Sequence, residues 1–581
     1  GGGATSLWGN MAMGGVINVV SGRATRRTFE FRPQYGNRDT RKADLFASDV
    51  WGKVSAAVNG SLLDTDGFPQ VAASERGPID TNAAVLFRNV NVKSEYAPTS
   101  AVRVWARGGY FSEERDNAKV TTFAPTRPEG NDTTWKTGNG GVRIVLPDSS
   151  ALEGTAFVDS VRFRSNFIAV PNLATRAIGR LTLEQNVPTT NAGGSLTWSR
   201  GFGLRNFFTA GTDLRWVEGD SEEDGYDAVT GLTRNIRRVS GGTQRSVGAF
   251  LQDIYTPIDR MTITASARVD HWRNYNAHNF ENTVVNGVVG NPTANNNPNL
   301  PGRTDTVVSP RLGAKYSITP RLNVWGSVAA GFRTPTLNEL YRQFRVGAIL
   351  TLANPSLGPE RLVGTELGVN AEVVRNMTVR ATWYDNRVRN PVSNVTIATN
   401  TQQRQNLGKT RVQGLQTDLE YRVGTTWRFS GGYLFNDARV REFAANPSLV
   451  TNCPGNPGEA CFLPQVPRHR GTLQAAYTEP RFINLSVQLQ FMGQQYDDDQ
   501  NVRGVPSNGC TVAAFAPCAN PGLPGYTMVD MSASRMLGRN LEVFFGVQNI
   551  GNVEYFVQTY PSTIGTPRLV NGGVRVRFSG R

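Results

Sequence analysis

The four cysteines are the residues whose spacing most directly suggests chemistry. They form two pairs of identical spacing, Cys453 with Cys461 and Cys510 with Cys518, and each pair lies in a segment rich in Gly, Pro and Asn. Such a pair predicts a disulfide that closes its own loop, which implies an oxidising compartment such as the periplasm or the cell surface. The alternative is a zinc site with four thiolates, which usually has tighter spacing and would require the two loops to meet. We favour two disulfides.

Three consecutive carboxylates, Asp497, Asp498 and Asp499, follow Tyr496 and are a candidate for calcium, which prefers oxygen ligands. A solvated polar loop is the alternative that we favour. We therefore expect no bound metal and no cofactor.

The sequence offers few residues that could form a catalytic site. The three histidines, His271, His278 and His469, are scattered along the chain, and only His271 has acids near it, in Asp270 and Glu281. A barrel hydrolase would need a nucleophile and a histidine at one rim, which leaves Asp270 with His271 as the one candidate. Because such a pair more often marks a solvated strand end, we predict that the protein is not an enzyme.

The net charge of +14 comes almost entirely from arginine. Nucleic-acid binding would gather these residues on one helix or stripe, whereas here they are spread singly along alternating segments. We therefore expect no nucleic-acid partner. A basic, water-filled interior that favours anionic solutes fits the pattern better.

The segments that must position these residues alternate between apolar and polar side chains. From residue 482 to 491, Ile483, Leu485, Val487 and Leu489 are interleaved with polar residues, and residues 377 to 383 follow the same pattern. No run of about 18 apolar residues could span a bilayer as a helix. One face suits lipid and the other suits water, which predicts an all-β transmembrane barrel, since closure removes every strand edge. A soluble sandwich would need a second sheet with a matching apolar face.

Short turns and long loops alternate along the chain. Five compact turns each follow a tyrosine, namely Tyr96, Tyr255, Tyr316, Tyr421 and Tyr477. A repeated tyrosine at one rim predicts an aromatic girdle at a bilayer interface. Between these turns lie ten long polar loops, residues 64–82, 112–137, 169–190, 218–242, 273–308, 331–370, 387–407, 437–468, 494–523 and 551–568. Long loops on one rim only are typical of bacterial outer-membrane barrels.

One long segment resembles a known family. Residues 331–370 read GFRTPTLNELYRQFRVGAILTLANPSLGPERLVGTELGVN, and this sequence resembles the C-terminal half of TonB-dependent outer-membrane receptors. Residues 1–22, GGGATSLWGNMAMGGVINVVSG, resemble the last piece of the plug domain of the same receptors. The final strand, residues 570–578, resembles the closing strand of that family.

The resemblance implies an all-β fold, a 22-stranded antiparallel transmembrane β-barrel with a remnant of an N-terminal plug domain, and counting alternating segments also gives about 22 strands. Residues 1–26 would be the end of the plug and residues 27–581 the barrel. The rest of the plug and the energy-coupling box would lie upstream of Gly1. The expected location is the bacterial outer membrane, with the long loops extracellular.

The function that the resemblance implies is energy-coupled uptake of a scarce ligand such as a ferric siderophore or cobalamin. A passive porin-like outer-membrane channel is the alternative. The expected partners are outer-membrane lipid and lipopolysaccharide, a small-molecule ligand of siderophore or corrinoid type, and the inner-membrane TonB complex. Ligand binding would use loop aromatics and arginines, because arginine offers planar donors and aromatic rings stack on flat ligands. The candidates are Phe332, Arg333, Tyr341, Arg342, Phe344, Arg345 and Tyr496.

Overall fold

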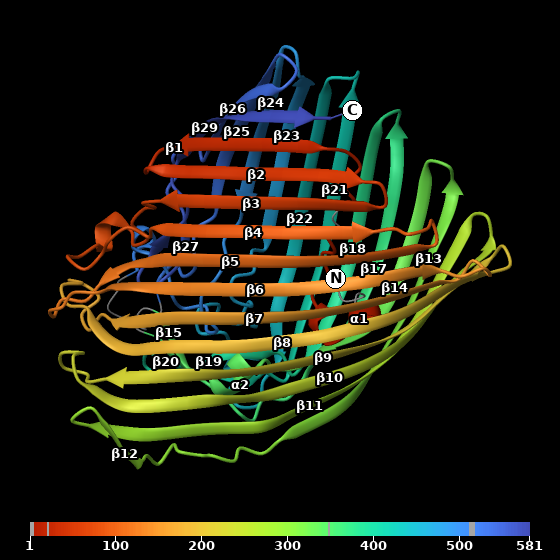
Figure 1. Cartoon of the computed structure of the whole chain (residues 1–581). Helices are drawn as coiled ribbons and strands as arrows, with labels where there is room; N and C mark the ends of the chain where they lie inside the picture. Colours follow the sequence, from red (N-terminus) through yellow and green to blue (C-terminus); the bar gives the residue numbers. More distant parts are fainter. Residues whose placement is uncertain (1–4, 20–21, 347–348, 511–517, 581) are drawn as a thin grey trace.

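The structure, a computed structural model, describes residues 5–19, 22–346, 349–510 and 518–580. Its main element is a sheet of 23 antiparallel strands that closes on itself, because the first strand, β1, pairs with the last, β29. One short strand, β12, only extends its neighbour, so the closed barrel of the described chain has 22 strands. The predicted fold class is confirmed. Figure 1 shows the strands wrapping around one lumen.

The barrel strands are β1 (Thr28–Gly36), β2 (Thr40–Trp51), β3 (Val54–Thr65), β4 (Val85–Tyr96), β5 (Val102–Val120), β6 (Pro128–Val145), β7 (Ala151–Ala169), β8 (Arg180–Phe202), β9 (Asn206–Tyr226), β10 (Arg234–Ile258), β11 (Met261–Val285), β13 (Arg303–Thr319), β14 (Leu322–Arg333), β17 (Glu360–Val374), β18 (Met377–Arg389), β21 (Lys409–Val423), β22 (Trp427–Glu442), β23 (His469–Glu479), β24 (Ile483–Met492), β25 (Tyr526–Leu537), β26 (Leu541–Gln548) and β29 (Leu569–Ser579). Strand β12 spans Val288–Pro292.

The remaining elements are not part of the barrel wall. They are α1 (Thr5–Trp8), α2 (Leu337–Tyr341), α3 (Ser448–Thr451), the 3-10 turns η1 (Gly9–Ala12), η2 (Ala73–Glu75) and η3 (Pro506–Asn508), a small sheet of β15 (Phe344–Val346), β16 (Ile349–Leu352), β20 (Thr401–Asn406) and β19 (Val392–Ala398), and a pair formed by β27 (Phe556–Gln558) and β28 (Thr563–Ile564). None of the described helices has the length and apolar character needed to cross a bilayer.

The two rims of the barrel differ as predicted. Each of the five turns that follow a tyrosine joins two neighbouring barrel strands, as Asp259 and Arg260 join β10 to β11. Three of these tyrosines, Tyr96, Tyr255 and Tyr316, are exposed on the barrel wall. The long loops and the small sheet lie at the opposite end of the barrel (Figure 1).

Several strands are longer than the alternation indicated. Strands β10 and β11 pair from Ile236 with Thr283 down to Ile258 with Met261, with two register shifts, through residues that we expected to form loops. Polar side chains do not end a strand when the neighbouring strand continues to supply backbone hydrogen bonds. The loops that connect the strands are shorter than predicted for the same reason, and β5 and β6 leave only residues 121–127 between them.

The N-terminal segment α1 and η1 lies inside the barrel, where it contacts β11, β13 and β14. The guanidinium of Arg268 on β11 donates to the carbonyl oxygen of Leu7 at 3.4 Å and is paired with Asp213 and Asp270. The N-terminal segment therefore covers part of the inner face of β11. Along the middle of this strand the inward residues are buried and the outward residues are exposed. That residues 1–26 are the end of a plug stays a prediction.

Candidate ligand-binding site

Helix α2 is the centre of the loop that joins β14 to β17. Thr336 caps it, because its Oγ1 accepts from the backbone N–H of Glu339 at 3.2 Å while the Glu339 carboxylate accepts from the Thr336 N–H at 2.8 Å. Arg333, the last residue of β14, donates to Glu339 at 2.8 Å and also pairs with Glu360, the first residue of β17. A reciprocal cap of this kind satisfies donors that the helix start would otherwise leave unpaired. The helix is thus fixed to both flanking strands.

An apolar cluster holds the other face of α2. Leu340 and Tyr341 are buried against Ala277 of β11 and against Leu357. Burial raises the pKa of the Tyr341 phenol. Tyr341 therefore belongs to the core under the loop.

The small sheet brings a second loop onto α2. Strand β16 pairs in parallel with β20, with Leu350 opposite Thr401. This pairing carries Arg404 of β20 to the end of α2, where its Nη1 donates to the carbonyl oxygens of Asn338 and Arg342. The guanidinium of Arg404 therefore joins two loops that are distant in sequence.

A cavity of about 460 Å³ opens beside this junction. The wall strand β7 contributes Phe163 and Phe167, and the loops contribute Arg342, Phe344 and Arg404. The Arg404 guanidinium lies 4.9 Å from the centre of the Phe344 ring, and that of Arg342 lies 5.4 Å from the centre of the Phe163 ring. Aromatic faces and planar cations thus alternate around the space.

The charges of this cavity are not balanced. Its other two cations are neutralised, because Arg176 pairs with Asp80 at 2.6 Å and Lys119 with Glu129 at 2.9 Å. Neither Arg342 nor Arg404 has an ion-pair partner within 4.0 Å among the described residues.

The buried Nε of Arg342 also has no hydrogen-bond partner in the described chain. Burial lowers the pKa of Arg342 and lowers that of Arg404 to about 10. A guanidinium keeps its proton at neutral pH, so both are cations. A buried and a partly buried cation without an ion-paired carboxylate leave room for an anion, because a charge removed from water without a partner is costly.

A second cavity of about 290 Å³ continues behind Arg342. It shares Phe163, Asn338 and Arg342 with the first cavity and is also lined by Asn10 of η1. The Asn10 amide donates to Thr334 Oγ1 at 3.0 Å, next to the start of the α2 loop. The N-terminal segment therefore reaches the same site from inside the lumen.

The structure separates the predicted ligand-binding residues into groups. Arg342 and Phe344 line the cavity, whereas Arg333 is held in its two ion pairs and Tyr341 in the apolar cluster. Phe332 is fully buried against Trp272 and Val307. The side chain of Arg345 lies outside the described residues.

Sequence reasoning missed Arg404 and Phe163. Arg404 lay within a predicted long polar loop, and no local pattern placed it against α2. Phe163 lies on an alternating strand, where only the register identifies its inward face.

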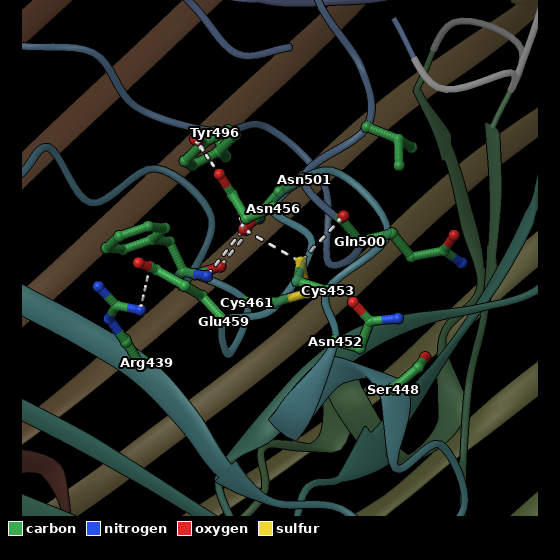
Figure 2. The surroundings of a disulfide bond; sticks show 12 residues. Arg439, Ser448, Asn452, Cys453, Asn456, Glu459, Cys461, Tyr496, Gln500 and Asn501 are labelled. Atoms are coloured by element: carbon green, nitrogen blue, oxygen red, sulfur yellow. Dashed lines mark hydrogen bonds and ion pairs between the residues drawn. A yellow bond between two sulfur atoms is a disulfide. The ribbon is translucent and has the colours of Figure 1, made fainter.

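Tyr496 belongs to a different pair of loops, residues 443–468 and 493–525. Its ring stacks on Phe462 with 5.6 Å between ring centres, and its hydroxyl donates to Asn456 at 3.0 Å. Figure 2 shows Tyr496 and Asn456 beside the disulfide between Cys453 and Cys461. These contacts occupy the ring and hydroxyl that we expected to meet a ligand.

Both predicted disulfides are confirmed. Cys453 is bonded to Cys461 and Cys510 to Cys518, with Cα atoms 4.9 and 5.2 Å apart. No free cysteine is left in the described chain for a thiolate zinc site.

The three neighbouring aspartates point to different partners. Asp497 accepts from the N–H and hydroxyl of Thr559, and Asp499 from those of Thr396. Asp498 accepts from the backbone N–H groups of residues 500, 502 and 503. Burial raises the pKa of Asp497 and Asp499. Calcium would need these oxygens to converge, and among the described residues no three acidic, His or Cys side chains do so.

The Asp270 and His271 pair is divided by the barrel wall. Asp270 is buried on the lumen side in its pair with Arg268, whereas His271 is on the exposed face and is hydrogen-bonded to Thr306 at 2.9 Å. Successive strand residues point to opposite faces, so these two side chains do not form an acid–base pair.

A family model described as TonB dependent receptor-like, beta-barrel, matches residues 23–550. The chain belongs to the TonB-dependent receptor family. Its location is therefore the bacterial outer membrane, and the homologues are transport receptors, not enzymes.

Two relatives illustrate the distance within this family. The chain is 23% identical over 261 residues to the "Probable TonB-dependent receptor BfrD" of Bordetella pertussis, a match that covers 45% of this chain and 32% of that protein. It is 23% identical over 340 residues to the "Ferrioxamine receptor" of Yersinia enterocolitica, covering 57% of this chain and 39% of that protein. The matched part is thus less than half the length of these curated relatives.

Solved structures show the same fold. The ferric-catecholate import receptor Fiu of E. coli K12 superposes with a TM-score of 0.74 at 16% identity, covering 99% of this chain and 85% of that chain. The copper transporter OprC superposes with a TM-score of 0.71 at 13% identity, covering 96% and 81%. At these identities the likeness establishes the architecture alone.

Proposed function

We propose that the protein is an outer-membrane receptor for energy-coupled uptake of a small anionic metal chelate of the siderophore type. The observation that carries this proposal is the pair of Arg404, which is buried, and Arg342, which is partly buried; neither has an ion-paired carboxylate among the described residues, and both line one cavity. Bidentate hydrogen bonds from arginine suit carboxylate and catecholate oxygens.

The aromatic residues support a flat or ring-bearing ligand. Phe163, Phe167 and Phe344 line a volume of about 460 Å³, which lies within the usual range of small-molecule sites. An uncharged ligand would leave both guanidinium groups without a counter-charge, so the arrangement favours an anionic chelate. A corrinoid remains the second ligand class.

The N-terminal segment has a place in this proposal. Residues 1–26 would be the end of the plug and residues 27–581 the barrel, so that the Asn10 to Thr334 hydrogen bond joins the plug to the ligand loop. The inner-membrane TonB complex would act through the plug. A passive porin-like channel would admit solutes without this coupling.

The test uses the protein folded in detergent and the double variant Arg342→Gln with Arg404→Gln. Binding of ferric citrate, an anionic ferric catecholate and an uncharged ferric hydroxamate is followed by tryptophan fluorescence. We expect the variant to lose about tenfold in affinity for the anionic chelates, the equivalent of one or two charged hydrogen bonds. The control is Arg260→Gln with Arg539→Gln, which removes the same charge from two short turns at the other rim.

Equal affinity of the wild type and the double variant for every chelate would contradict the proposal that Arg342 and Arg404 bind the ligand. Uptake by cells that continues after the proton-motive force is dissipated would favour the porin-like channel instead. The two results are separable, because one concerns the site and the other concerns coupling.

A further inference from the structure

Two arginines face each other on the outer surface of the barrel. Arg245 of β10 is directly opposite Arg273 of β11, and both are exposed. Their neighbours Ser246, Trp272 and Asn274 point the other way, since Ser246 lines the inner cavity and the other two are buried. The alternation of the strands therefore directs both guanidinium groups outward.

This arrangement has a cost that the described residues do not offset. Directly opposed side chains have Cβ atoms about 5 Å apart, and like charges at that distance destabilise a sheet. Arg273 lies over the Tyr275 ring at 5.4 Å, but neither arginine has a carboxylate within 4.0 Å among the described residues. Along the register, Asp305 lies opposite Trp272 and is already paired with Arg361, and Glu218 lies opposite Thr243.

The same barrel contains a neutralised counterpart. Arg387 of β18 is directly opposite Arg411 of β21, and both donate to the Asp385 carboxylate at 2.9 Å. Asp385 therefore neutralises the Arg387 and Arg411 pair, whereas no carboxylate of the described residues neutralises Arg245 and Arg273. An anion from outside the chain can take that place.

The position of the pair indicates which anion is available. Just below it on the same face are His271, which is opposite Val247, and the apolar Val247, Val269 and Leu251, and all four are exposed. Tyr316 is opposite Met261 at the short-turn rim, and Arg273 lies about 30 Å above that point for a tilted strand. That height equals the thickness of the hydrocarbon layer. The two arginines therefore lie at the level of the outer-leaflet headgroups, beside the hydroxyls of Thr304 and Thr306.

We propose that Arg245 and Arg273 form a clamp for the phosphate of an outer-leaflet glycolipid. Each guanidinium presents two parallel N–H donors, and a phosphate monoester between them accepts from both while its negative charge removes their repulsion. The acyl chains of the same lipid pack on the valine and leucine side chains below. The site is separate from the lumen and does not depend on the transported ligand.

The test measures lipid binding to the protein folded in detergent. Three probes are compared, namely diphosphorylated lipid A, the same lipid after removal of both phosphates, and inorganic phosphate. We expect Arg245→Gln with Arg273→Gln to weaken binding of diphosphorylated lipid A about tenfold and to leave binding of the dephosphorylated lipid unchanged. Arg245→Lys with Arg273→Lys, which keeps the charge and loses the fork, is expected to fall between the two.

The control Arg260→Gln with Arg539→Gln removes two exposed arginines from the short turns and should bind the lipid as the wild type does. Circular dichroism and heat-dependent gel mobility check that every variant is folded. Wild-type affinity in the Gln double variant, or equal affinity for the two lipids, would overturn the proposal. Competition by inorganic phosphate at the same concentration as the lipid would show a site for free phosphate and would also overturn it.

Discussion

Two groups of extracellular loops are held over the lumen by different chemistry. The loop around α2, residues 334–359, is fixed by charges, because Arg333 joins Glu339 to Glu360. The paired loops, residues 443–468 and 493–525, are fixed by two disulfides and by Asn501, whose amide bonds both the N–H and the carbonyl of Phe462. The charged loop contributes Arg342 and Phe344 to the proposed anion site, whereas none of the described residues of the paired loops lines it. Ion pairs can rearrange around a charged ligand, while covalent bonds maintain one shape.

The largest expected effect is on the charged loop. Arg333→Ala leaves the partly buried Glu339 and the buried Glu360 without their cation, which we expect to cost about 3 kcal/mol of local stability. Hydrogen exchange of residues 334–359 should rise sharply, and that of residues 443–468 should not. The matched control is Arg361→Gln, whose more exposed pair with Asp305 should contribute under about 1 kcal/mol. Equal exchange in the two variants would contradict this assignment.

The converse change acts on the paired loops. Cys453→Ser with Cys461→Ser opens a short covalent loop, which the chain-entropy account values at about 2.5 kcal/mol. Exchange should rise in residues 443–468 and in residues 493–505, because Gly455 N–H donates to Gln500 across the two loops. Residues 334–359 should keep wild-type exchange. A rise there would show that the two groups of loops are coupled.

A smaller change separates the amide contacts from the disulfide. Asn501→Ala removes four hydrogen-bonding contacts of a fully buried side chain whose backbone has φ of 55°. We expect a loss of about 2 kcal/mol, since buried partners are left unpaired and Asn tolerates this backbone better than Ala. Thermal unfolding of the detergent-folded protein, together with exchange of residues 456–462, measures the loss. Asn508→Ala, which removes one 3.3 Å hydrogen bond, is the control.

The smallest effect is a difference in response to acid. Burial alone would raise the pKa of Glu339, but the hydrogen bonds from Arg333 and Thr336 and the charge of Arg333 together outweigh it and hold the pKa below its ordinary value of 4.5. The stabilisation from this pair is therefore complete above pH 4.5 and is lost as the pH falls through the lowered value.

Asp499 behaves in the opposite way, because burial raises its pKa and protonation relieves a cost of the folded state. Between pH 5 and pH 3.5, exchange corrected for its intrinsic rate should increase in residues 334–359 and should not increase in residues 493–505. The same change in both segments would refute the comparison.

Local sequence patterns were sufficient to predict those features whose surroundings, lipid on one side and water on the other, recur along the chain. The alternation from Ile483 to Met492 predicted a membrane strand because lipid and water lie on opposite faces of every such strand. The five tyrosines predicted one rim because each stands at the same interface. The cysteine spacing predicted both disulfides because each pair closes a loop within one segment.

The roles of single side chains in the loops did not follow from local patterns. Phe332 and Tyr341 have the composition of ligand contacts, but neighbouring strands and loops bury them, so they support the site without facing it. Arg404 reaches the site only through the parallel pairing of β16 with β20, which joins residues about fifty positions apart.

The sequence by itself determined the all-β class, the sidedness of the barrel, the disulfides and, through its resemblance to a family, the kind of protein. Only the tertiary structure decided which arginines are neutralised and which are left for an anion. Arg333 ends β14 and Arg342 lies in the loop that follows, yet Arg333 pairs with two carboxylates, whereas Arg342 lies over the Phe163 ring and lines a cavity. The physical reason is that a charged side chain is neutralised by groups that are close in space. Strand register and loop pairing determine which groups those are.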